Sequence, residues 1–240
     1  MIVKYLLAAL VAGVIAGGLV TVAQQAKVVP LILEAEKYEN APTEAHDHVS
    51  GLTLAFATPA MAHEHAAAGE EEGGMLFGVN RLTGTAMANV VTGCGFALIM
   101  LAISLFTGRT VTVADGALWG AAGWLVFQLL PSIGLPPELP GFPAADLYAR
   151  QIWWFGTVLA SAVGLYLVVL RPEIWAKISG LVVLLLPHLI GAPQPGDLTS
   201  NVPAVLAAEF AVASLATGLF FWLVTGLLLG TFNARFVKAA

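Results

Sequence analysis

Long runs of uncharged, apolar residues constrain this chain more than any other feature. Reading between the charged residues gives six such blocks: 5–22, 82–108, 116–134, 152–170, 178–192 and 210–232. About 20 apolar residues match the thickness of a bilayer's hydrocarbon core. A helix satisfies its own backbone hydrogen bonds in that dry environment. The sequence therefore predicts an all-α integral membrane protein, a multi-pass protein in contact with lipid.

The number of spans depends on one short block. Five blocks are long enough to cross a bilayer, whereas 178–192 is short, contains Pro187 and His188, and ends next to Pro193. These features fit a kinked span or a re-entrant segment. We expect a bundle of six transmembrane helices, with five as the alternative. The predicted division is a first transmembrane helix over 1–26, an extramembrane loop over 27–81, and a helical membrane bundle with about five further apolar segments over 82–240.

Charge is scarce and unevenly placed. Only 10% of residues are charged and 58% are hydrophobic, whereas soluble domains carry about 25% charged residues. The segment 27–81 has nine acidic and three basic residues, a net charge of −6, and the remainder has six acidic and seven basic residues. A negative segment suits a cation and does not suit nucleic acid. The single cysteine, Cys94, excludes a disulfide framework.

Four of the five histidines lie in this acidic loop, in two matching units: His46-Asp47-His48 and His63-Glu64-His65. Imidazole and carboxylate are ligands for divalent first-row metals. In an extended segment, side chains two residues apart point the same way, so both histidines of a unit can reach one ion. The loop is predicted to capture metal. The alternative is a solvated loop whose histidines are incidental.

The fifth histidine, His188, lies inside an apolar block. An ionisable side chain at membrane depth is costly and normally faces a cavity or a partner. Pro187 beside it removes a backbone donor and so frees a carbonyl. We expect His188 on a permeation path, the alternative being an interfacial residue that snorkels. The other path candidates are Gln128, Glu138, Asp146, Gln151 and Glu209. Asp146 could also pair with Arg150, four residues on, if both were helical.

Small residues recur at four-residue spacing within the blocks. The rows are Gly13/Gly17, Gly116/Gly120, Gly156/Ala160/Gly164 and Gly226/Gly230. Such rows allow two helices to approach closely in lipid. We expect most of them to pack helices within one chain, with homo-oligomer contacts as the alternative.

Orientation follows from the distribution of lysine and arginine. With six spans and the N-terminus inside, the inner side holds Lys4, Arg109, Arg171, Lys177, Arg235 and Lys238, and the outer side holds Lys27, Lys37, Arg81 and Arg150. A five-span chain with its N-terminus outside gives the same split. We favour six spans, which place the acidic loop outside, where a cation would arrive. No GxxxxGK[ST], HExxH or GxSxG pattern occurs, so we expect no enzyme activity and no resident cofactor.

Three stretches carry a resemblance to a known family. They are QQ at 24–25 with VPLILEAE at 29–36; PPELPG at 136–141 with AAD at 144–146 and ARQIWW at 149–154; and LPHLIGAPQP at 186–195. Together they resemble the CbtA family of proposed cobalt transporter subunits, over nearly the whole chain. The resemblance implies about five spans, cobalt uptake for cobalamin synthesis and a partner, CbtB, with a single span and a histidine-rich end. A bacterial inner membrane is the expected location.

The residues themselves favour transport of a divalent metal without choosing which one. Nickel or zinc are therefore alternatives to cobalt at this stage. A further alternative is a membrane scaffold or sensor subunit that binds metal but does not conduct it.

Overall fold

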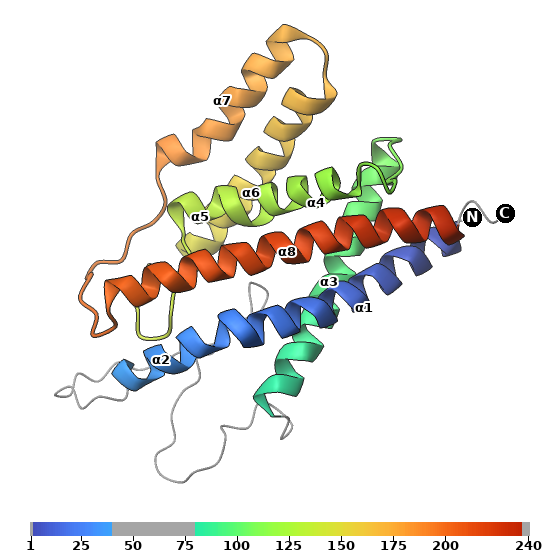
Figure 1. Ribbon diagram of the computed structural model, residues 1–240. Helices are drawn as coiled ribbons and strands as arrows, with labels where there is room; N and C mark the ends of the chain where they lie inside the picture. The colour runs from blue at the N-terminus through green and yellow to red at the C-terminus, as the bar shows by residue number, and fades with distance from the viewer. Residues whose placement is uncertain (1, 40–79, 237–240) are drawn as a thin grey trace.

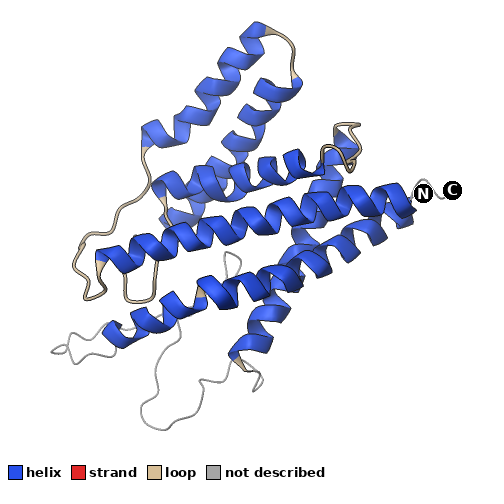
Figure 2. Ribbon diagram, viewed as in Figure 1, coloured by secondary structure: helices blue, strands red, loops and turns tan. Residues whose placement is uncertain are grey.

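The computed structural model describes residues 2–39 and 80–236, and every regular element within them is helical (Figures 1 and 2). The helices are α1 (Ile2–Lys27), α2 (Val29–Glu39), α3 (Arg81–Phe106), α4 (Gly116–Trp124), a π-helical turn η1 (Leu125–Leu129), α5 (Leu130–Gly134), α6 (Leu147–Leu170), α7 (Ile174–Ile190) and α8 (Ala204–Phe236). The prediction of an all-α integral membrane protein is confirmed.

Within residues 2–39 and 80–236, five helical stretches are long and apolar enough to cross a membrane: α1, α3, the continuous α4–η1–α5 rod, α6 and α8. The sixth apolar helix, α7, has 17 residues, close to the lower limit of about 17 for a span. It runs antiparallel to α6 and brings the chain back toward the end where α8 begins (Figure 1). The described chain therefore starts and finishes at the same end of the molecule (Figure 1).

The two ends of the molecule differ in charge. The end at which α1 begins and α8 ends, called here the basic end, also holds the α3–α4 and α6–α7 connections (Figure 1). The turns and connections at this end contain Lys4, Arg109, Asp115, Arg171, Glu173, Lys177 and Arg235. The opposite end, called the acidic end, carries Lys27, Glu34, Glu36, Lys37, Glu39, Arg81, Glu138, Asp146, Arg150, Asp197 and Glu209 among the described residues. An excess of basic residues is typical of the cytoplasmic side of a membrane protein.

Glycines set how closely the helices approach. A Cβ on Gly13 of α1 would lie 2.5 Å from the Cα of Cys94, and one on Gly116 of α4 would lie 2.5 Å from the carbonyl oxygen of Gly226. Gly164 of α6 meets Gly180 of α7 in the same way. Close packing within one chain, predicted from the small-residue rows, is confirmed at these crossings. Gly156 is an exception, because nothing lies within 4 Å of its added Cβ.

Two apolar clusters hold the helices together. In the first, the rings of Phe96, Phe127, Phe221 and Trp222 join α3, η1 and α8, with ring centroids 4.7–6.3 Å apart. The second lies at the acidic end, where Val28 and Ala35 pack with Leu139, Val202 and Phe210. This second cluster fixes α2 against the start of α8 and the α5–α6 connection.

Helix α2 corrects one boundary of the sequence analysis. The sequence predicts loop from residue 27 onward, yet Val29–Glu39 is helical. Pro30 is compatible with this because a proline in the first helical turn costs no hydrogen bond. The buried Ala35 and the partly buried Leu31 and Ile32 then give the helix an apolar side. The segment is amphipathic, so it reads as polar in composition although it packs on the bundle.

Candidate functional site

His188 lies in the last turn of α7 and faces α6. Its ring centroid is 6.0 Å from that of Trp153, with an interplanar angle of 67°. Both imidazole nitrogens and the Trp153 Nε1 are buried, and no described protein group forms a hydrogen bond with them. An unpaired buried polar group costs about 1–3 kcal/mol. This inward orientation favours the path interpretation of His188 over the snorkelling one.

The backbone around His188 is irregular at the end of α7. Gly191 is the C-cap of α7, its φ of +89° suits glycine, and its amide donates to the Pro187 carbonyl at 3.0 Å. Because Pro187 has no N–H, the carbonyl of Val183 loses its helical donor. Gly134, at the end of α5, leaves room for the Trp153 ring, since its added Cβ would meet that ring at 2.5 Å.

A polar stripe on α6 continues from Trp153 along α7. Thr157 and Ser161 follow at four-residue intervals and are both fully buried, so all three share one helix face. Thr157 Oγ1 donates to the Trp153 carbonyl at 2.8 Å, whereas Ser161 Oγ has no described hydrogen-bond partner. We call this stripe, together with His188, the α6–α7 seam. The sequence analysis missed Thr157 and Ser161, although their spacing from Trp153 was a usable signal.

Gln128 lies in the π-helical turn η1, within the α4–η1–α5 rod. Its side-chain amide is packed against Gly218 of α8, where a Cβ would clash with it. Pro131 follows and supplies no backbone N–H, so the regular ladder is interrupted at this point. π-Helical turns inside helices are frequent at functional sites. The rod therefore places an amide and irregular backbone within a membrane-spanning element.

Two carboxylates at the acidic end, those of Glu138 and Asp146, each have a specific partner. Arg150 Nη2 lies 2.8 Å from Glu138 Oε2. Burial raises the pKa of the Glu138 carboxyl, and the Arg150 charge offsets part of that shift. The Asp146–Arg150 pair that the spacing allowed does not form: Asp146 is the N-cap of α6, and its Oδ1 accepts from the Ala149 amide at 2.9 Å. A side chain used for capping points along its own helix start, which leaves Arg150 to Glu138.

The remaining candidates lie near the same end. Glu209 is exposed in the first turns of α8, and Gln151 is half-buried in the first turns of α6. Among residues 2–39 and 80–236, no three His, Cys, Asp or Glu side chains gather closely enough to hold a metal ion. The six loop residues, His46, Asp47, His48, His63, Glu64 and His65, lie outside the described residues.

A second polar cluster lies between α1 and α3. Asn89 Nδ2 donates to Thr21 Oγ1 at 3.0 Å and to Gln24 Oε1 at 2.7 Å. Thr21 Oγ1 in turn donates to the Gly17 carbonyl at 2.8 Å. Both amide protons of Asn89 are thus used by the protein. Such a satisfied cluster acts as interhelical adhesion in a membrane protein.

The helices, their apolar lengths and their sparse buried polar groups define a multi-pass α-helical membrane protein. A family model for CbtA, described as a probable cobalt transporter subunit, matches residues 2–234. The chain therefore belongs to the CbtA family. No curated protein and no solved structure matches it.

Proposed function

We propose that this chain carries Co²⁺ across the bacterial inner membrane into the cell, where the metal serves cobalamin synthesis. The observation that carries this proposal is the match to the probable cobalt transporter subunit family over residues 2–234. The family is named as a subunit, so we also propose a partner, a small CbtB-like protein with one span and a histidine-rich end. Nickel and zinc remain competitors, since imidazole and carboxylate ligands accept several divalent metals.

Capture is assigned to the acidic loop. The described residues on either side of it, α2 and the start of α3, both lie at the acidic end. The Arg81 Nη2–Glu36 Oε1 ion pair, at 2.7 Å, joins these two helices. Metal held by the two histidine units would therefore be released beside Glu138, Asp146 and Glu209. A high local density of negative charge raises the local concentration of a cation.

Passage is assigned to the α6–α7 seam and to the Gln128 region. A metal ion entering the bilayer must replace its water ligands, because an unpaired charge in a medium of low dielectric is very costly. The seam offers the imidazole of His188, the hydroxyl of Ser161 and a backbone carbonyl freed by Pro187. Glu138 lies at the acidic end, Gln151 lies in the first turns of α6 next to the start of the seam, and Gln128 supplies an amide within the neighbouring rod.

The test is metal flux into liposomes that contain a divalent-metal indicator, with Co²⁺, Ni²⁺ and Zn²⁺ compared, and with and without the partner subunit. His188→Ala should lower the maximal Co²⁺ rate about tenfold or more, the effect of losing about 1.4 kcal/mol of barrier stabilisation. Leu189→Ala is the matched control, because Leu189 is the exposed neighbour of His188. Its rate should equal that of the unmodified chain.

Two results would contradict the proposal in different ways. Metal binding without flux, even with the partner present, would identify a scaffold or sensor. A normal maximal rate for His188→Ala would show that the path lies elsewhere while leaving transport intact.

A further inference from the structure

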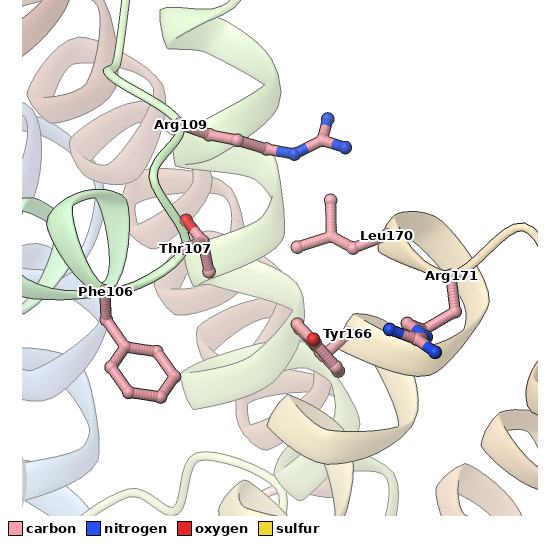
Figure 3. Close-up of a pocket in the computed structure, with 6 residues that line it drawn as sticks. All are labelled: Phe106, Thr107, Arg109, Tyr166, Leu170 and Arg171. Atoms are coloured by element: carbon pink, nitrogen blue, oxygen red, sulfur yellow. The ribbon is translucent and has the colours of Figure 1, made fainter.

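A cavity of about 230 Å³ lies at the basic end, between the last residues of α3 and the last residues of α6. It is lined by Phe106, Thr107, Arg109, Tyr166, Leu170 and Arg171. Figure 3 shows the Arg109 side chain extending from the α3 side toward Leu170, with Arg171 and the Tyr166 ring on the α6 side. Two guanidinium groups and a phenol therefore border one space. The proposed metal path uses none of them.

The charges around this cavity leave a net positive centre. Arg171 Nη2 pairs with Glu173 Oε1 at 2.9 Å. In the described part of the chain, Arg109 forms no ion pair. Its backbone is nevertheless fixed, because the Arg109 amide donates to the Ser104 carbonyl at 3.0 Å and Ser104 Oγ donates to the Arg109 carbonyl at 2.8 Å. The two arginines and one glutamate, from the α3–α4 and α6–α7 connections, sum to a single positive charge beside the cavity.

The cavity opens onto apolar helix surfaces. Phe106 is 91% exposed, and Tyr166 and Val169 of α6 are also exposed. α3 packs mainly against α1 and α8, whereas α6 packs mainly against α7, α5 and η1. The cationic groups therefore sit above side chains that lipid tails would contact. A cationic pocket above apolar flanks matches an amphiphile with an anionic head.

We infer that this cavity binds an anionic phospholipid, one whose net charge is −1, through the phosphate of its headgroup. Guanidinium groups bind phosphate oxygens through paired, charge-assisted hydrogen bonds, and the Tyr166 hydroxyl adds a donor. The acyl chains would lie along Phe106 and Leu170. A basic pocket between helices, at the end rich in lysine and arginine, is the arrangement that selects anionic headgroups. Free phosphate shares the headgroup chemistry but gains nothing from the apolar flanks.

The test uses the full-length protein in neutral detergent and native mass spectrometry. Phosphatidylglycerol and phosphatidylcholine of identical acyl composition are compared as probes. The unmodified protein should bind phosphatidylglycerol more tightly, and Arg109→Gln should weaken that binding about fivefold. Arg171→Gln should do the same, and Tyr166→Phe should have a smaller effect. Arg235→Gln, at the same end but outside the cavity, is the control and should bind normally.

Folding does not confound the Arg109→Gln measurement, because Arg109 has no ion pair to lose within the described residues, and this variant should keep the Tm of the unmodified protein. Equal binding of the two lipids would overturn the inference, as would normal binding by both arginine variants. An equal loss of phosphatidylglycerol binding in Arg235→Gln would show that the lipid responds only to the general surface charge, and this too would overturn the inference. Displacement of phosphatidylglycerol by millimolar inorganic phosphate would assign the cavity to a free anion and also contradict the inference.

Discussion

Gly13 of α1 and Gly93 of α3 lie back to back where the two helices cross, so that the backbones themselves are in contact. A Cβ on Gly13 would lie 2.6 Å from the Gly93 carbonyl carbon. Gly17 repeats the contact one turn later, where its Cβ would meet the Asn89 carbonyl oxygen at 2.5 Å. This close approach also brings the Asn89 amide within reach of Thr21 and Gln24. Lipid supplies little hydrophobic drive between helices, so close packing and hydrogen bonds stabilise the pair.

The first prediction compares two glycines on the same helix. Gly13→Ala should destabilise the protein by about 1–3 kcal/mol, because the obstructing atoms are backbone and cannot move aside. Gly18→Ala should have no such cost, since nothing lies within 4 Å of its added Cβ, and alanine is the better helix former. Unfolding in mixed micelles of increasing denaturing detergent measures both. Equal destabilisation by the two variants would contradict the packing.

Much of the fold could be predicted because membrane-spanning helices are recognisable in a sequence by their length and apolar composition. The expected rod at 116–134 matches Gly116–Gly134, and the crossings at Gly13 and Gly116 follow from the small-residue rows. The π-helical turn at Leu125–Leu129 could not be predicted, because it depends on how the rod packs against α8 and on Pro131. α2 was missed since its apolar side is too short to resemble a span.

Individual residues of the candidate site could be predicted from the sequence, but the contacts between them could not. His188 stood out as an ionisable group in an apolar block. Its contact with the Trp153 ring joins α7 to α6, and Gly134 of α5 leaves room for that ring, so the contact involves three helices that are separate in sequence. Similarly, i to i+4 spacing suggested Asp146 for Arg150, whereas the N-cap role of Asp146 decided against it. Sequence spacing can suggest ion-pair partners only within one helix. Arg150 instead pairs with Glu138, which lies outside α6.

The second prediction concerns topology. Both termini should face the cytoplasm and the segment 40–79 the opposite side, because α7 returns the chain to the acidic end before α8 begins. Single cysteines placed at Ser50 and at Ala239, in a Cys94→Ala background, should react with a membrane-impermeant reagent from opposite sides. Reaction from the same side would mean that α7 does not cross.

The third prediction concerns metal capture. Replacing His46, His48, His63 and His65 together by alanine should raise the half-saturating Co²⁺ concentration for flux at least about tenfold and leave the maximal rate unchanged. Capture by the loop raises the local concentration of Co²⁺ but does not change the free-energy barrier that the ion meets inside the bilayer. Binding to the unmodified protein should fade below about pH 6, as imidazoles protonate. Calorimetry across pH on both proteins measures this, and unchanged binding after the fourfold replacement would contradict it.

The fourth prediction uses the raised pKa of Glu138, which burial produces against the opposing effect of Arg150. A carboxyl with a raised folded-state pKa is most favourable to the fold when protonated, so its contribution is present at low pH and is lost as pH rises through that pKa. Glu138→Gln mimics the protonated form. The Tm of the unmodified protein, relative to this variant, should therefore fall as the pH rises from the ordinary range of a glutamate pKa through the raised pKa of Glu138. A relative rise would mean that the ion pair with Arg150 outweighs burial.

The last prediction concerns Gln128, whose amide lies against Gly218 within the α4–η1–α5 rod. Gln128→Met keeps the length of the side chain and removes its polar group. Because a polar side chain within the bilayer is costly unless it serves a partner or a passing ion, the variant should be as stable as the unmodified protein or more so. Its Co²⁺ flux should nevertheless fall about tenfold, since one ligand for the dehydrated ion is gone.

Gln194→Met is the matched control for this test, because Gln194 lies in the connection between α7 and α8, outside both helices. It should change neither Tm nor flux. A gain in stability together with a loss of flux is the pattern of a functional polar residue held at a cost to the fold. Loss of both would instead make Gln128 a packing residue of the π-helical turn. Normal flux in a protein of normal stability would remove Gln128 from the path and leave the α6–α7 seam as the only proposed route.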